Sequence, residues 1–204
     1  GEYIEFMAPG VIILTAIFTS IFGGVNTLWD RRYGFMNKAL TSPISRSAIA
    51  IGKMSAISLI AALQASLIIG IALAIGVTFP NPLMIIPIMG IVILFSLGFS
   101  GISVTLAATA KSQETFWGMI NLLGMPLFML SPALFPLELL PSWLAVIAKL
   151  NPVTYTILLV RELMTGVSEG GVPILLSIGV ILAFVVAMVA IASYVFTREV
   201  NKPF

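Results

Sequence analysis

The stretch Gly98-Phe99-Ser100-Gly101 looks most like catalytic machinery, because a serine set between glycines is typical of the nucleophile turn of hydrolases. A serine nucleophile needs a base, yet the chain contains no His, and no Lys lies in the apolar stretch around Ser100. We therefore interpret Gly98, Gly101 and the nearby Ser103 as small residues that allow two helices to pack closely.

Other kinds of chemistry lack their residues as well. The absence of Cys and His excludes thiolate catalysis, disulfides, imidazole bases and the usual zinc ligands. No segment has the GxxxxGK[ST] pattern of a phosphate-binding loop, so we expect ATP to bind on another protein. The ten basic and eight acidic residues are too scattered to bind nucleic acid. The sequence thus predicts a chain that is not an enzyme and binds no metal or cofactor itself.

The composition instead predicts an all-α integral membrane protein. Hydrophobic residues make up 59% of the chain and charged residues only 9%, whereas soluble domains are about one quarter charged. A helix needs about 20 mostly apolar residues to cross a bilayer. Five stretches meet this length and are predicted to span the membrane as one domain: residues 8–28, 54–79, 83–110, 117–135 and 172–196.

The distribution of Lys and Arg predicts how the spans are oriented, since basic residues in short loops stay on the cytoplasmic side. If the loop at residues 29–53 is cytoplasmic, eight basic residues lie on that side: Arg31, Arg32, Lys38, Arg46, Lys53, Lys111, Arg198 and Lys202. Only Lys149 and Arg161 lie on the other side. We therefore expect a multi-pass protein of the cell membrane, with the first residue of this sequence outside and its last residue in the cytoplasm.

The loop at residues 29–53 carries an unusual concentration of charge. Four apolar residues recur within it at helical spacing: Phe35, Met36, Ala39 and Leu40. This pattern predicts a short amphipathic helix, from Arg31 to Leu40, at the inner membrane surface. Ser42 and Pro43 have the residue types that cap and begin the next helix. The charges either only orient the chain and meet lipid headgroups, or belong to a structured handle for a soluble partner.

Residues 136–171 are apolar but interrupted by prolines, and we predict a surface helix or a re-entrant hairpin at the outer interface. Arg161 lies in this segment and has two interpretations. At membrane depth it needs a partner, with Glu162 or Glu138 as the nearby candidates, because an unpaired charge there is costly. Alternatively, Arg161 extends to the outer headgroups.

Few polar residues occur within the predicted spans. Four of them could line a transport path: Asn26, Gln64, Asn121 and Ser131. For each one, a hydrogen bond between helices is the competing interpretation. Since the surrounding residues are rich in Met and Phe, an apolar or amphiphilic substrate suits such a lining better than a sugar or a metal ion.

Two motifs resemble a known family. The run DRRYGFMNKALTSPISR, followed by Ile51-Gly52-Lys53, resembles the first cytoplasmic loop of permease subunits of type-2 ABC exporters, especially the daunorubicin-resistance-like drug exporters. The sequence Asn151-Pro152-Val153-Thr154-Tyr155, with Arg161 six residues after the tyrosine, is similar to the signature that follows that family's fifth span. Val153 departs mildly from the larger apolar residue that is usual there.

The resemblance implies a helical bundle of the ABC-2 permease type that works as a dimer, with itself or with a sibling permease. ATP and Mg would bind to a separate ATP-binding subunit that docks on the inner loop. The residues implied for this contact are Asp30, Arg31, Arg32, Gly34, Phe35, Lys38, Leu40, Pro43 and Arg46. The outer segment would cap the transport route, with Pro152, Tyr155, Arg161 and Glu162 in gating or structural roles. Family permeases have six spans, so the resemblance also implies that the first span is missing here.

We therefore interpret the sequence as that of the permease subunit of an ATP-driven exporter of a small amphiphilic substrate. A secondary transporter or a channel without an ATPase partner is the alternative, although such proteins commonly carry charged residues inside their spans and this sequence has essentially none. A membrane scaffold without transport is a third possibility.

Overall fold

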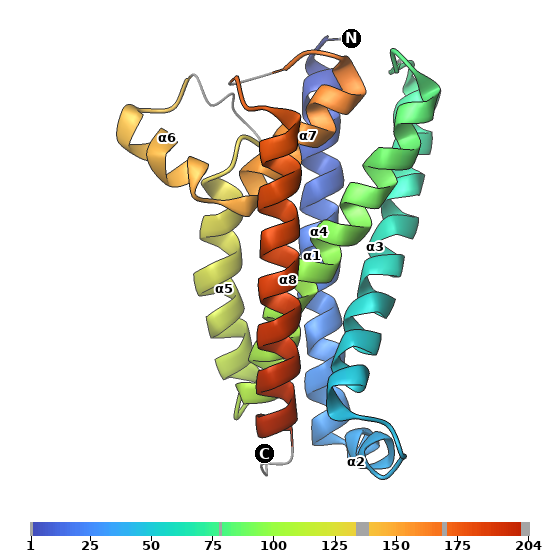
Figure 1. Cartoon of the computed structure of the whole chain (residues 1–204), viewed down its shortest axis with the longest axis vertical. Helices are drawn as coiled ribbons and strands as arrows, with labels where there is room; N and C mark the ends of the chain where they lie inside the picture. Colours follow the sequence, from blue (N-terminus) through green and yellow to red (C-terminus); the bar gives the residue numbers. More distant parts are fainter. Residues whose placement is uncertain (1, 78, 134–138, 169–170, 201–204) are drawn as a thin grey trace.

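A computed structural model describes residues 2–77, 79–133, 139–168 and 171–200 as a bundle of helices (Figure 1). The helices in these residues are α1 Glu2–Arg32, α2 Phe35–Leu40, α3 Arg46–Ile75, the 3₁₀ turn η1 Pro82–Met84, α4 Ile85–Thr109, α5 Gln113–Met129, α6 Ser142–Lys149, α7 Pro152–Thr165 and α8 Ile174–Glu199. The α2 helix, the α4–α5 connection and the end of α8 lie at one end of the bundle, and α6 lies at the other (Figure 1). We call these the α2 end and the α6 end.

Four helices in the described residues are long and apolar enough to cross a membrane: α1, α3, η1 with α4, and α8. The fourth of the five predicted spans, residues 117–135, is not among them, because α5 ends at Met129 and has 17 residues, or about 25 Å. Part of the predicted span, residues 134–138, lies outside the described residues. The α6–α7 pair, bent by 87°, could count as a further broken span or a re-entrant loop.

Two glycines end helices at positions that differ from the predicted ones. Gly34 has φ +77°, a left-handed conformation that ends the run of α1 and redirects the chain into α2. The predicted helix from Arg31 to Leu40 is therefore present but begins at Phe35, because residues 30–32 form the last turn of α1. Gly76, with φ +101°, ends α3 at Ile75, where the backbone N–H of Val77 bonds to the Ala72 carbonyl. The span predicted to reach residue 79 is thus shorter at this end.

The start of α3 also differs from the prediction that Ser42 and Pro43 begin this helix. The hydroxyl of Ser42 donates to the Ala39 carbonyl and so closes the end of α2. Ser45 is the cap of α3 instead, because its hydroxyl accepts from the backbone N–H of Ala48. Pro43 lies exposed in the connecting turn.

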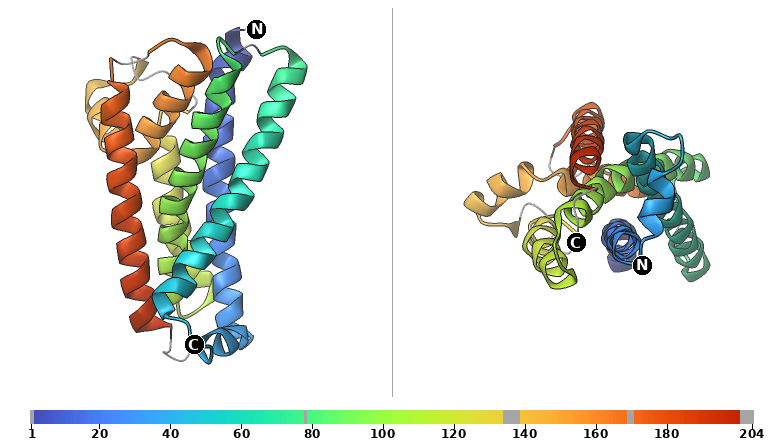
Figure 2. Two further views of the ribbon diagram at one scale, coloured as in Figure 1. Left: turned by 45° about the vertical axis from the view of Figure 1, so that its right-hand side comes forward. Right: turned by 90° about the horizontal axis from the view of Figure 1, so that it is seen from below.

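Helix α4 runs through the middle of the bundle and packs against α1, α3 and α8 (Figure 2). Small residues make these contacts close, as the sequence predicted for Gly98, Gly101 and Ser103. A Cβ atom on Gly98 would lie 2.9 Å from the Phe184 ring of α8, and one on Gly101 would lie 3.1 Å from Met188. The Ser103 hydroxyl donates to the Ser20 carbonyl of α1 at 2.6 Å. These contacts confirm the packing interpretation of the Gly98–Gly101 stretch.

Candidate functional site

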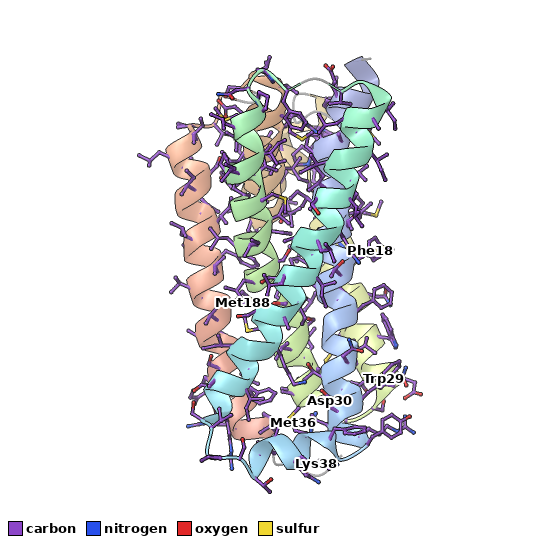
Figure 3. The ribbon with its side chains drawn as sticks, turned by 90° about the vertical axis from the view of Figure 1, so that its right-hand side faces the viewer. Phe18, Trp29, Asp30, Met36, Lys38 and Met188 are labelled. Atoms are coloured by element: carbon purple, nitrogen blue, oxygen red, sulfur yellow. The ribbon has the colours of Figure 1, made fainter. Side chains whose placement is uncertain are left out.

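The α2 helix lies across the end of the bundle and has one anchored side (Figure 3). Met36 is only 2% exposed and packs in an apolar cluster with residues of α3, α4 and α8, while Leu40 packs against the same cluster. Burial of such side chains holds α2 to three long helices. Phe35 was expected on this side, but it is 62% exposed, because it is adjacent to the buried Met36 in α2 and successive helical side chains point about 100° apart.

The opposite side of α2 and its neighbouring turns form an exposed basic and aromatic surface. We call it the α2 surface, and its residues are Arg32, Tyr33, Phe35, Lys38 and Ile44. The ammonium of Lys38 lies 5.9 Å from the centre of the Phe35 ring. Exposed apolar rings beside cations are typical of a surface that binds another protein or lipid headgroups.

Glu114 adds a negative charge at the same end of the bundle. It lies in the first turn of α5, where Ser112 caps the helix. Hydrogen bonds from its own backbone amide and with the Ser112 side chain lower the pKa of Glu114, and Arg32 contributes further. Glu114 therefore stays ionised close to the basic α2 surface.

Three other charged residues of the predicted contact bond to neighbouring helices. Asp30 forms a salt bridge with Lys53 of α3, which ties the end of α1 to the start of α3. Arg31 donates to the Ala107 carbonyl at 2.6 Å and thus caps the C-terminal end of α4. Arg46 donates to the Thr197 carbonyl of α8 at 3.3 Å. We call these contacts the helix-end clasp, and they join α1, α3, α4 and α8.

The clasp gives a testable prediction for stability. Asp30→Lys and Lys53→Asp should each lower the free energy of unfolding by about 1 kcal/mol, because each places like charges side by side in a part-exposed pair. The double variant should recover most of this loss, measured as the melting temperature in detergent. Arg32→Glu, a charge reversal two residues after Asp30 at an exposed position, serves as the control. If the free energy of unfolding lost in the double variant equals the sum of the losses in the two single variants, the Asp30–Lys53 pair contributes nothing to stability.

A groove between α1 and α3 contains two of the predicted path residues. Asn26 and Gln64 both line this groove, which has a volume of about 450 Å³. The Thr19 hydroxyl donates to the Gln64 side-chain oxygen across it. Phe18 and Phe22, both exposed on α1, form its rim. We call it the α1–α3 groove, and its mixture of amide and hydroxyl side chains with apolar and phenyl ones suits an amphiphile.

The other two path residues lie apart from that groove. Asn121 lines a smaller hollow of about 80 Å³ between α1 and α5, and its amide donates to the Trp117 carbonyl of its own helix. The two hollows share the α1 residues Leu14, Phe18 and Phe22. Ser131 is buried after the end of α5, where its hydroxyl donates to the Phe128 carbonyl. The structure thus brings Asn26 and Gln64 together and sets Asn121 beside them, on the other flank of α1.

The α6–α7 pair forms a hairpin with its elbow at Asn151, which is 5% exposed. The Asn151 side chain accepts from the backbone N–H of Val153 and donates to the Leu127 carbonyl of α5. Pro152 occupies the first position of α7, where its missing N–H costs nothing. The Tyr155 hydroxyl donates to the Lys149 carbonyl at 2.7 Å and so holds α6 against α7. The helical segment predicted between residues 136 and 171 is therefore present within the described residues, as two helices that meet at 87°.

Arg161 lies on α7 and is the largest side chain that the structure buries almost completely, with 2% exposed. It donates from Nη2 to the Pro132 carbonyl at 2.9 Å, and its guanidinium lies 3.9 Å from the centre of the Phe6 ring of α1. This burial contradicts the interpretation that Arg161 extends to the headgroups. Glu162 is half-buried on the same helix, and Glu138 lies outside the described residues.

The predicted sites gave no role to Lys53 or Asn151, although both residues hold these sites together. Asn151 could have been found, because an Asn followed by Pro is a strong start signal for a helix. Lys53 could not, since nothing local relates it to Asp30 before the register of α1 against α3 is known.

Comparison with known proteins identifies the family. Residues 2–165 match the ABC-2 type transporter family. The chain is 32% identical to the putative transport permease ycf38 of Cyanophora paradoxa over 164 residues, which are 80% of this chain and 57% of that protein. It is 24% identical to the daunorubicin resistance ABC transporter permease protein DrrB1 of Streptomyces coeruleorubidus, over 90% of this chain and 66% of that protein.

A third relative is the probable multidrug ABC transporter permease YbhR of Escherichia coli strain K12. It is 24% identical over 76% of this chain and 42% of that protein. The chain thus spans less than two thirds of the length of these three relatives. The family match nevertheless covers most of the residues that form the helix-end clasp, the α1–α3 groove and the α6–α7 hairpin. This multi-pass helical membrane protein belongs to the ABC-2 type transporter family.

Proposed function

We propose that this chain is the membrane-spanning permease of an ATP-driven exporter, and that a separate subunit binds ATP and Mg and docks on the α2 surface. A second permease, either another copy or a sibling chain, would complete the transporter. The family match and the relatives named as transport permeases support this assignment. The observation that carries it is the two-sided α2 helix, with Met36 buried in the bundle and a basic, aromatic surface exposed.

Such a helix can pass a displacement from a soluble subunit into the membrane. A push on the α2 surface would reach α3, α4 and α8 through Met36, since side chains in a packed cluster move together. The helix-end clasp would carry the same push to the end of α1. We therefore assign Asp30 and Arg31 to transmission of the motion, and Arg32, Phe35 and Lys38 to contact with the ATP-binding subunit.

The α1–α3 groove is the proposed entry to the substrate route. Its volume of about 450 Å³ falls within the range usual for small-molecule sites. The amides of Asn26 and Gln64 offer hydrogen bonds, and the phenyl rings at the rim offer apolar contact. An apolar or amphiphilic small molecule matches this combination. At the α6 end, we propose that the hairpin caps the route and that Arg161 holds it closed.

The proposed orientation places the α2 end in the cytoplasm. Support comes from the basic residues that gather there, including Arg32, Lys38 and Lys111, because positive residues in short loops stay on the cytoplasmic side. The α6 end would then face outward, with the N-terminal end of α1 beside it (Figure 1). Labelling of a single cysteine at Lys38 or at Lys149, in a chain that has no natural Cys, reads this orientation directly.

Charge reversal on the α2 surface tests the docking proposal. The double variant Arg32→Glu/Lys38→Glu should lose about tenfold or more in affinity for the ATP-binding subunit, because two interface cations become repulsive. The measurement is copurification of the ATP-binding subunit with the permease from membranes, followed by ATP-dependent substrate transport in vesicles.

Lys149→Glu, a reversal at the α6 end, provides the matched control and should leave copurification unchanged. Unchanged copurification in the α2 double variant would refute docking on this surface. Substrate transport in vesicles that contain no ATP-binding subunit would instead favour a secondary transporter.

A further inference from the structure

A second groove, about 280 Å³ in volume, lies between α4, α7 and α8 on a different side of the bundle from the α1–α3 groove. Its walls include Gly90 and Leu94 from α4, Leu159 and Leu163 from α7, and Ile178 and Leu182 from α8. Among the described residues, every one that lines this groove is apolar. We call it the α4–α8 groove.

The packing of α4 against α8 explains why the groove exists. Near the middle of the membrane the two helices are in close contact, since a Cβ atom on Gly98 would lie 2.9 Å from Phe184. Two turns toward the α6 end, a Cβ atom on Gly90 would meet nothing within 4 Å. The helices therefore separate toward the α6 end, and α7 closes the back of the space between them.

The depth of the groove matches one leaflet of the bilayer. Its α4 residues end at Leu94, nine residues after the first residue of α4, and its α8 residues end at Leu182, eight residues after the first residue of α8. At 1.5 Å per residue, the groove reaches about 12–14 Å into a hydrocarbon core of about 30 Å. It therefore occupies the leaflet at the α6 end.

The chemistry of the walls selects the occupant. A substrate with polar groups would find hydrogen-bonding side chains in the α1–α3 groove, at Thr19, Asn26 and Gln64, but none among the described residues of the α4–α8 groove. Hydrocarbon needs only contact with apolar atoms, which three walls provide. The α4–α8 groove is apolar and lies at the depth of one leaflet, so the acyl chains of phospholipids are next to it.

We propose that the α4–α8 groove holds one acyl chain of a phospholipid from the leaflet at the α6 end. The chain fills the space between the diverging helices and supports the buried α7 from the side. This inference rests on the membrane placement of the helices and not on the proposed ATP-binding partner.

The experiment uses the purified full chain in vesicles of phosphatidylethanolamine and phosphatidylglycerol that contain a phosphatidylcholine probe with a photoactivatable diazirine on its acyl chain. After irradiation, mass spectrometry maps the labelled residues. We expect labelling concentrated on α4, α7 and α8 at the groove. Gly90→Phe places a ring in the open space beside Gly90 and should reduce this labelling by roughly tenfold, because the acyl chain loses its contacts with the walls.

Gly179→Phe is the matched control, since Gly179 lies on α8 at similar depth and a Cβ atom there also meets nothing within 4 Å. Its labelling of the groove should equal that of the unchanged chain. Ile178→Trp fills the groove from the α8 side and replaces Gly90→Phe if that variant does not fold. Equal labelling in the filled-groove variant, or labelling spread evenly over all the long helices, would overturn the proposal.

Discussion

Replacing Gly24 with valine is expected to remove most of the folded protein from the membrane. A Cβ atom on Gly24 would lie 2.6 Å from the Ser103 Cβ and 2.9 Å from the Ser103 carbonyl, so α1 and α4 would have to separate. Overpacking of this kind costs about 1–3 kcal/mol. Separation would also stretch the hydrogen bond from Ser103 to the Ser20 carbonyl, one turn away. The measurement is the amount of monodisperse protein after extraction and its melting temperature.

Gly70→Val is the matched control for this experiment. Gly70 lies within α3, and a Cβ atom there meets nothing within 4 Å, so valine changes helix propensity without a steric conflict. We expect the control to express and melt like the unchanged chain. If Gly24→Val behaved in the same way, the close contact of α1 with α4 would not be what holds the bundle together.

Replacing Arg161 with alanine is expected to release the α6–α7 hairpin. The change empties the space of a large buried side chain and leaves the buried Pro132 carbonyl without its donor from Nη2. Together these losses should lower the free energy of unfolding by about 3 kcal/mol. Ala148 of α6 is fully buried, so a cysteine at this position should become reactive to an impermeant maleimide when the hairpin opens.

Two further substitutions separate the causes. Arg161→Met keeps most of the volume but not the donor, and Arg161→Lys keeps the charge but not the planar group over the Phe6 ring. If the polar contacts hold the hairpin, Met should expose the cysteine at residue 148 as much as Ala does. Thr165→Val, one turn along α7, is the control, since its hydroxyl makes local contacts at the end of α7: it donates to the Arg161 backbone carbonyl and accepts from the Val167 N–H. Unchanged reactivity and unchanged export in Arg161→Ala would show that Arg161 does not secure the hairpin.

The sequence was sufficient for those features that depend on composition and on strong local signals. Hydropathy predicted the long helices, because spanning a membrane imposes length and apolarity on each segment independently of its neighbours. The small residues Gly98 and Ser103 indicated close packing, and the structure confirms it. Such signals also predicted the order of the long helices and a shorter helical segment between residues 136 and 171, which contains α6 and α7.

Features that depend on the register between distant helices could not be predicted in this way. The charges at residues 30–32 look alike in the sequence, yet Asp30 meets Lys53 and Arg31 meets α4, while Arg32 stays exposed. Which of them faces inward depends on how α1 rotates against its neighbours. The cap of α3 was misplaced for a related reason, because Ser42 and Ser45 are equally good caps until Ser42 is used to close α2.

The α6–α7 hairpin makes the two halves of this protein unequal in cross-section. Helix α7 has 14 residues, about 21 Å, so it widens the bundle near the α6 end and adds nothing near the α2 end (Figure 2). A wedge of this shape displaces more lipid from one monolayer than from the other. Lateral pressure in that monolayer should therefore oppose the width that the hairpin adds.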